Sequence, residues 1–344
     1  MAPKIFATGA SGYIGGAALD AIINAHPDYD ITALVRSPQK AAALVAKYPN
    51  LKTVNGDLDS GSVIESETEK ADIILHFADC DHVPAAKSIS AGLKKKTTPA
   101  FIIHTSGSAI LPDITKGEFG QQADEKIYDD IESVKEITSF PIDGHLHRDV
   151  DTIILEANSD NVRTAIVCPP TIYGVGAGTA GNTRSAQVPG LTKGTLKRGE
   201  AFQVTAGKSI WNNVHIDDLS QLYLLLTEDA AAGGKKATWG TEGYYFAENG
   251  EHVWGELAKK IAEKAKVKGY LKTNDVASLS VDDIKEIHPF GAVLWGTNSR
   301  GKASRARKVL GWAPKGAPLE ETLDALIDSE AKLLGLEPSG QTVV

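Results

Sequence analysis

The sequence contains little cysteine. Its 344 residues include only Cys80 and Cys168, and both lie at the ends of runs that we expect to be buried strands. We therefore expect no disulfide framework, because such frameworks need several cysteines in an oxidising compartment. Reduced thiols favour the cytosol, and the first expected strand begins by residue 4, which leaves no room for a cleavable leader. We expect a cytoplasmic protein.

Long apolar runs and an excess of positive charge are also missing. There is no run of about 20 apolar residues, so we expect no helix that spans a membrane. The formal net charge is -8, which argues against nucleic acid or an anionic membrane as a partner. The length exceeds what one hydrophobic core usually covers, so we expect a large domain with an additional lobe.

The most distinctive segment is rich in glycine and lies near the start of the chain. Strand-like residues 4–8 lead into Gly9, Gly12 and Gly15, and an apolar helical pattern follows. Gly9 permits a tight exit from the strand, Gly12 lets backbone amides approach a pyrophosphate, and Gly15 allows close helix–sheet packing. Phosphates are favoured at the positive end of such a helix. The segment predicts a dinucleotide site, and a glycine turn without a ligand is the alternative.

Short β-rich runs alternate with amphipathic stretches along the chain, which is the pattern of parallel βαβ units. Strands are expected at 4–8, 30–36, 51–55, 73–78, 100–105 and 163–169, with helical stripes at 89–93, 150–157, 219–226 and 254–261. These runs predict an α/β fold with a doubly wound, Rossmann-like parallel sheet and a smaller, mostly helical C-terminal substrate lobe.

The organisation of the chain changes near residue 174. Residues 174–207 are rich in Gly, Thr, Ser and Lys and have weak periodicity, so we expect a long loop there. We expect the dinucleotide-binding domain to span 1–175 and to continue at 208–249. The expected substrate-binding lobe comprises 176–207 and 250–344.

Six segments stand in an order that resembles a known family. They are TGASGYIG at 8–15, GDL at 56–58, HTSGS at 104–108, CPPTIYG at 168–174, VHIDD at 214–218 and KVLGWAP at 308–314. The ordered set resembles the extended and atypical short-chain dehydrogenase/reductases, a group that includes nucleotide-sugar epimerases and dehydratases. The resemblance covers nearly the whole chain.

This resemblance implies cofactor contacts along the edge of the sheet. Arg36 closes the second expected strand, where an acidic residue would favour a free ribose 2′-hydroxyl and an arginine would pair with a 2′-phosphate. We therefore expect NADP(H) rather than NAD(H), and an ordinary exposed arginine is the alternative. The implied cofactor-binding residues are Thr8, Gly9, Ser11, Gly12, Tyr13, Ile14, Gly15, Arg36, Asp57, Leu58, Ala78, Thr105 and Pro169.

The catalytic positions depart from the family pattern. Members that oxidise or reduce alcohols use a Tyr as general acid/base, a Lys four residues later, and a Ser after strand 5. Here the Tyr and Lys positions fall near Asp143 and His147, and the Ser position falls at Gly107. The segment that should carry Tyr-x-x-x-Lys therefore lacks it.

Other residues near these positions remain able to exchange protons. Histidine titrates near neutral pH and is a competent general acid/base. A solvated pair of histidines at a helix start is the alternative, and we expect no metal site, because no further ligands stand at a recognisable spacing. The catalytic candidates are His147, His145, Ser106, Ser108 and Tyr173.

Substrate contacts are expected in two places. The DCDH run at 79–82 follows strand 4, where ligands gather in open α/β sheets, and the loop after residue 174 crosses the mouth of the site in this family. Arg184 would pair with a carboxylate or phosphate, and Trp211 would add an apolar wall unless it packs in the core. The substrate-binding candidates are Asp81, His82, Tyr128, Asn182, Arg184, Ser185, Gln187 and Trp211.

Two functions are compatible with these features. The first is an NADP(H)-dependent reductase or epimerase-type enzyme that acts on a small polar metabolite with a non-standard proton donor. The second is a catalytically silent protein that binds NADP(H) and signals its redox state. A homodimer is possible in either case, because family members often pair through two helices, here those near 84–96 and 147–158.

Overall fold

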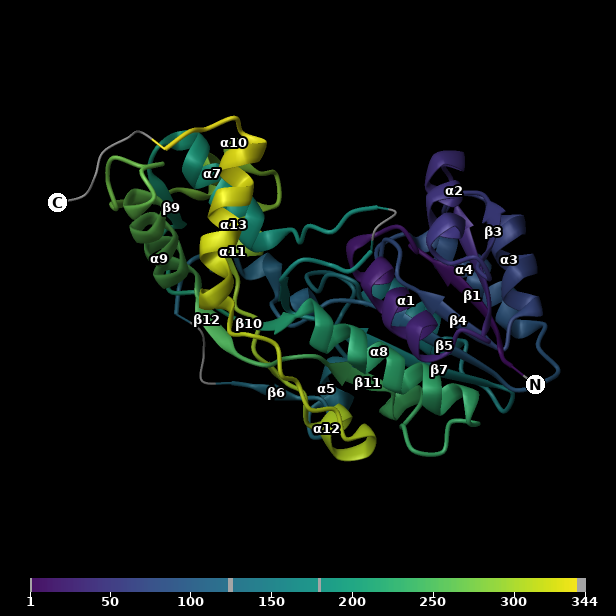
Figure 1. Ribbon diagram of the computed structural model, residues 1–344. Coiled ribbons are helices and arrows are strands. Elements are labelled where there is room, and N and C mark those ends of the chain that lie inside the picture. Colours follow the sequence, from purple (N-terminus) through teal and green to yellow (C-terminus); the bar gives the residue numbers. More distant parts are fainter. Residues whose placement is uncertain (1, 123–125, 179–180, 339–344) are drawn as a thin grey trace.

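A seven-stranded parallel sheet forms one half of the molecule (Figure 1), in a computed structural model that describes residues 2–122, 126–178 and 181–338. The strand order is β11-β7-β5-β4-β1-β2-β3. The strands are β1 (Lys4–Thr8), β2 (Asp30–Val35), β3 (Lys52–Asn55), β4 (Ile73–His76), β5 (Ala100–Thr105), β7 (Val162–Cys168) and β11 (Tyr244–Phe246). All six expected strands are present within two residues of their expected ends, so the doubly wound sheet is confirmed.

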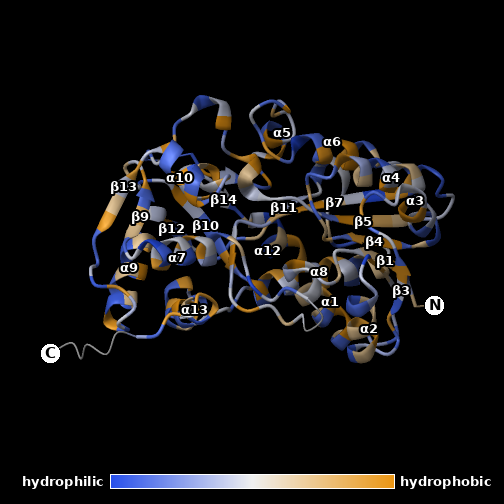
Figure 2. Cartoon of the chain, turned by 90° about the horizontal axis from the view of Figure 1, so that it is seen from above, coloured by the Kyte–Doolittle hydropathy of each residue, from blue (hydrophilic) through white to orange (hydrophobic). Residues whose placement is uncertain are grey.

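Helices cover both faces of this sheet (Figure 2). One face carries α1 (Tyr13–Ala25), α2 (Pro38–Lys47) and α8 (Ile216–Ala231). The other face carries α3 (Gly61–Lys70), α4 (Val83–Lys94), α5 (Val134–Ile137) and α6 (Arg148–Glu156). The chain order reverses between β1 and β4, and ligands of open α/β sheets bind in the crevice at such a reversal.

The second lobe has a core of its own, in which Trp254, Trp295 and Phe202 are buried. Its larger helices are α7 (Gln187–Arg198), α9 (Trp254–Val267) and α13 (Leu319–Leu333), with α10 (Val281–Ile287) and α11 (Gly291–Gly296) beside them. Its strands are β8 (Thr171–Tyr173), β9 (Ala201–Val204), β10 (Ile210–His215), β12 (Glu251–Val253) and β13 (Val276–Leu279). The expected mostly helical C-terminal lobe is confirmed.

The expectation of a long loop over 174–207 is wrong in its second half. Residues 187–198 form α7 and residues 201–204 form β9, which pairs in parallel with β13. Glycines inside α7 weaken its helical pattern, but Gly194 lets the helix lie close to the Phe202 ring, because an added Cβ would be 2.9 Å from that ring. Packing against the lobe therefore stabilises a helix that the local sequence does not favour.

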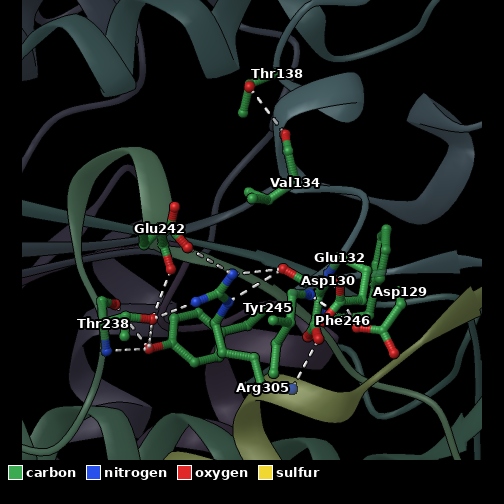
Figure 3. A network of polar contacts seen from close by, with 11 residues as sticks. Asp129, Asp130, Glu132, Val134, Thr138, Thr238, Glu242, Tyr245, Phe246 and Arg305 are labelled. Atoms are coloured by element: carbon green, nitrogen blue, oxygen red, sulfur yellow. Dashed lines mark hydrogen bonds and ion pairs between the residues drawn. The ribbon is translucent and has the colours of Figure 1, made fainter.

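A polar network lies near β6 (Tyr128–Asp129), β14 (Gly301–Lys302) and α12 (Ser304–Leu310), and Figure 3 shows it around Asp130 and Arg305. The carboxylate of Asp130 accepts hydrogen bonds from the backbone amides of Arg305 at 2.7 Å and Phe246 at 3.0 Å. The Arg305 guanidinium donates to the Asp130 carbonyl and to Thr238 Oγ1. Burial raises the pKa of Asp130 to about 7. This network anchors the start of the segment that leads to His145 and His147.

Cys80 and Cys168 are both unpaired thiols, in agreement with the expected absence of a disulfide framework. Within the described ranges, no helix combines the length and the apolar character that crossing a bilayer requires.

Candidate active site

The glycine turn, residues 8–15, has the backbone that close approach to a dinucleotide requires. Gly9 has φ of +75°, which favours glycine, and an added Cβ there would be 2.6 Å from the Ala78 amide nitrogen. A Cβ on Gly15 would be 2.3 Å from the Gly9 carbonyl oxygen. Gly12 is the N-cap of α1 and offers no side-chain cap, so the first amides of the helix stay available to an anion. This cradle fits a pyrophosphate.

The other residues expected to bind the cofactor follow strand ends along the same edge of the sheet. Arg36 comes directly after β2 and is exposed, and among the described residues it makes no hydrogen bond or ion pair. Asp57 and Leu58 follow β3, and Ser60 donates a hydrogen bond to the Asp57 carboxylate at 2.9 Å. That bond lowers the pKa of Asp57. Ala78, Thr105 and Pro169 end or follow β4, β5 and β7.

A cavity of about 260 Å³ lies between the glycine turn, the ends of β4 and β7, and residues 182–187. Tyr13 and Ile14 line it from α1, and Asn182, Arg184, Ser185 and Gln187 line it from the other side. The amide of Asn182 donates to the Ser11 carbonyl at 3.1 Å, so this segment is held against the glycine turn.

Arg184 has a different partner from the expected substrate anion. Its guanidinium forms a two-point ion pair with Glu330 of α13, in which Nη2 donates to Oε2 at 2.9 Å. The Glu330 side chain is almost fully buried. Two charge-assisted bonds to a buried carboxylate hold the arginine in place, so Arg184 links residues 182–187 to the second lobe.

Cys80, Asp81 and His147 form a polar cluster at the carboxyl edge of the sheet, which we call the His147 cluster. Asp81 Oδ1 lies 2.6 Å from His147 Nδ1, and Cys80 Sγ lies 3.4 Å from the same nitrogen. Cys80 and Asp81 follow β4, whereas His147 is the N-cap of α6 and has φ of +68°. Such a φ is costly for a residue with a side chain, and costly backbone geometry concentrates at functional sites.

The cluster stabilises a charged pair. Burial alone would lower the pKa of His147, but hydrogen bonds to Asp81 and Cys80 raise it well above its usual value. Burial would raise the pKa of Asp81, but the hydrogen bond to His147 lowers it below its usual value. Nδ1 of the ring is therefore fixed on a carboxylate, while Nε2 makes no hydrogen bond among the described residues.

Gly107 makes room for the ring of His147. An added Cβ at Gly107 would be 3.0 Å from His147 Nε2, and the backbone φ of -161° at Gly107 is extended and open to any residue. Space, and not backbone conformation, therefore demands glycine here. The family resemblance places a serine at this position. Here the residue is Gly107, and the imidazole of His147 lies in the space that a serine side chain would take.

Known proteins resemble this chain both in sequence and in fold. Residues 9–138 match the NAD(P)H-binding family. An oxidase from Acremonium sp, named ucsJ, is 39% identical over 350 residues, which cover 98% of this chain and all of that protein. The chain belongs to the same family as this oxidase. Its relatives support an NAD(P)-dependent enzyme.

Solved structures of two nucleotide-sugar enzymes share the fold of this chain. The dTDP-glucose 4,6-dehydratase of Streptomyces venezuelae, solved with NAD bound, has a TM-score of 0.67 at 16% identity, covering 97% of this chain and 99% of that chain. The UDP-glucose 4-epimerase of Thermotoga maritima has a TM-score of 0.65 at 15% identity, covering 96% and 99%. At such identities the likeness concerns the fold alone.

The Tyr-x-x-x-Lys pair is missing from the segment near 143–147, where the family resemblance places it. The spacing does occur once in the sequence, at Tyr48 and Lys52. Tyr48 ends α2 and hydrogen bonds with Asp20, and Lys52 begins β3 and pairs with Asp30 at 2.7 Å. Both residues therefore have structural partners away from the candidate active site.

The remaining catalytic candidates have internal partners. Ser106 donates to Asp151 at 3.0 Å, and Ser108 is buried and accepts from Ser299. Tyr173 donates to the Ala317 carbonyl at 2.8 Å inside the second core. His145 donates from Nδ1 to the Ile110 carbonyl at 2.7 Å and stacks on Phe140. Among the five candidates, His147 is the one whose ring is paired with a carboxylate from the loop after a sheet strand.

The remaining substrate candidates are dispersed. Trp211 is buried in the second core and donates its indole N–H to the Thr297 carbonyl, so it packs there and does not form a pocket wall. Gln187 donates to the Leu294 carbonyl, and Tyr128 packs edge-on against Phe140. His82 caps α4 and lies 3.2 Å from Asp59. Asp81 is the candidate that joins the His147 cluster. The contact of Cys80 with His147 was not predicted, because the two residues lie 67 positions apart.

Proposed function

We propose that this chain is an NADP(H)-dependent oxidoreductase for a small polar substrate, in which His147 exchanges the proton that the family's tyrosine normally exchanges. The observation that carries this proposal is the pairing of Asp81 with His147 Nδ1 at 2.6 Å, while Nε2 makes no hydrogen bond in the described part of the chain and lies against Gly107, just after the end of β5. A carboxylate on Nδ1 fixes the tautomer and orientation of an imidazole whose other nitrogen works as acid or base.

The chain's own residues supply the binding and the orientation. The amides at the start of α1 would hold the pyrophosphate, Arg36 would pair with a 2′-phosphate, and Asp57 would lie at the adenine end. When bound, the nicotinamide supplies or accepts the hydride. Residues 182–187 form one wall of the cavity beside the glycine turn. The name of the related oxidase supports an oxidoreductase in preference to an epimerase.

The cofactor preference is tested at Arg36. We expect NADPH to bind at least tenfold more tightly than NADH, because a charge-assisted bond to a phosphate contributes about 1.5–3 kcal/mol. Arg36→Ala should weaken NADPH binding by that factor and leave NADH binding unchanged, as measured by isothermal titration calorimetry. Equal affinity of the natural protein for both cofactors would contradict the assignment.

The proton donor is tested with a matched pair of histidine variants. Turnover is sought in both directions, with NADPH against carbonyl compounds and with NADP⁺ against alcohols. His147→Gln should lower kcat about 100-fold or more and leave the NADPH Kd unchanged, since general acid–base groups contribute about 10²–10⁴-fold. His145→Gln is the control and should retain turnover.

Two outcomes would count against this function. Undiminished turnover in His147→Gln would remove His147 from the chemistry. Tight NADPH binding with no turnover across a broad panel would instead support a protein that senses the redox state of NADP(H).

A further inference from the structure

Three different metal-ligating atoms converge in the His147 cluster. Cys80 Sγ, a carboxylate oxygen of Asp81 and a ring nitrogen of His147 all lie within 4.8 Å of one another. Thiolate, imidazole and carboxylate together form the ligand set that zinc prefers, whereas magnesium and calcium take oxygen ligands. The fold, and not sequence spacing, makes this set, because α6 brings His147 to the loop after β4.

The distances suit a shared cation. A tetrahedral zinc ion bound at about 2.3 Å from sulfur and about 2.0 Å from nitrogen holds those two ligands about 3.5 Å apart. Cys80 Sγ and His147 Nδ1 are 3.4 Å apart. The 2.6 Å between Asp81 Oδ1 and Nδ1 is a hydrogen-bond distance, and the Asp81 side chain is 53% exposed, so its carboxylate is able to rotate outward. The proton in that bond lies where the cation would bind.

We propose that Cys80, Asp81 and His147 bind a thiophilic divalent cation of the Zn²⁺ class, and that this cation inhibits the enzyme. Binding forms bonds to Sγ, Nδ1 and a carboxylate oxygen of Asp81, and it releases the thiol proton and the Nδ1 proton to solvent. Water fills the fourth position on the exposed side of Asp81. Three protein ligands with one open position distinguish this site from closed structural zinc sites.

Inhibition follows from competition for one nitrogen. A cation on Nδ1 replaces the hydrogen bond between Asp81 and His147, so the imidazole loses the partner that orients it. The inhibitory role rests on the proposed function of His147, whereas cation binding does not. The two parts therefore need separate measurements.

Binding is tested by titrating the metal-free full-length protein with Co²⁺ in a buffer that contains a reductant without thiols. We expect one equivalent to produce a thiolate-to-cobalt charge-transfer band, and Zn²⁺ to abolish it by displacement. Cys80→Ser should remove the band, and His147→Gln should weaken Co²⁺ binding at least tenfold. Two matched controls should keep the band: Cys168→Ala, which alters the buried thiol, and His82→Asn, which retains a helix-capping side chain.

Circular dichroism and NADPH binding confirm that each variant is folded. A band that is missing from the natural protein, or one that survives in Cys80→Ser, overturns the site whether or not turnover is found. For inhibition, each protein's turnover with Zn²⁺ is compared with its own turnover in chelator. We expect Zn²⁺ to lower turnover of the natural protein at least tenfold at a concentration that saturates the Co²⁺ site. A normal band without any loss of turnover overturns the inhibitory role and leaves the binding site standing.

Discussion

The glycine turn and the His147 cluster lie on the same edge of the sheet, yet they are built in opposite ways. The turn comes from eight consecutive residues, and its geometry is fixed by steric limits at Gly9 and Gly15. The cluster comes from two segments separated by 66 residues or more, and its geometry is fixed by hydrogen bonds to one imidazole nitrogen. The proposed cofactor cradle is thus determined locally, whereas the proposed proton-exchange group depends on how the whole sheet assembles.

This difference explains how the family's chemistry is able to change while its cofactor site is kept. Any side chain on Gly15 meets the backbone of the turn, so the turn has few alternatives. The position of the proposed proton-exchange group has more freedom, because a ring that enters from α6 needs only a carboxylate partner and a small neighbour. Asp81 supplies the first and Gly107 the second.

The largest effect is expected from a change in the glycine turn. Gly15→Ala places a methyl group 2.3 Å from the Gly9 carbonyl oxygen, so the turn must open and the amides of α1 must move. We expect NADPH affinity to fall at least 30-fold, together with a loss of about 1–3 kcal/mol in the free energy of unfolding. Calorimetric titration and chemical denaturation measure the two effects.

A glycine elsewhere provides the control. Gly190 lies in α7, and an added Cβ there would be 3.3 Å from the Trp295 ring. Replacing a helical glycine by alanine contributes about 1 kcal/mol of helix propensity, which offsets the tighter packing. Gly190→Ala should therefore leave NADPH affinity unchanged. If Gly15→Ala also bound NADPH normally, the turn would not be the cofactor cradle.

A smaller and more selective effect is expected at Gly107. Gly107→Ala places a methyl group 3.0 Å from His147 Nε2, and the extended backbone tolerates alanine, so the ring must shift. We expect about a tenfold loss of kcat, since misplacing a catalytic group by a fraction of an ångström is costly. The NADPH Kd and the melting temperature should not change. An unaltered kcat would show that the ring position does not limit turnover.

The contrast between a local turn and a cluster of distant residues also explains how much of the site could be predicted from the sequence. The sequence placed the turn, the strand ends and Arg36 at one edge of the sheet, and the structure has them there, because parallel strands bring their carboxyl ends together. His147 and Asp81 were each identified, but their contact was not, since no local pattern relates a loop after β4 to the start of α6. Arg184 was expected to bind substrate because its partner Glu330, 146 residues later, carries no sequence signal.

In the fold, the error over 174–207 has a related cause. The sheet strands show their burial in runs of apolar residues, and these runs were located correctly. Helix α7 contains Gly190, Gly194 and two threonines, and its stability comes from contacts with β9 and with the helices of the second lobe. Tertiary packing stabilises α7 in spite of its weak helix propensity. Apolar periodicity in the sequence does not reveal such packing.

The smallest effect separates a structural histidine, His252, from His147, the proposed catalytic one. His252 lies in neither region, is buried between Asn213 and Trp254, and has its pKa lowered by burial to about 3. Since its folded pKa lies below the unfolded value, the unfolded chain binds the proton first, and stability falls as pH decreases through about 6.5. From pH 8 to pH 6 we expect a loss of about 1 kcal/mol, and His252→Gln should lack this part of the loss in denaturant titrations at both pH values. Identical pH dependence in the variant would contradict a neutral buried His252. If the loss does disappear while kcat keeps its pH profile, the histidine that governs turnover is a different one from the histidine that governs stability.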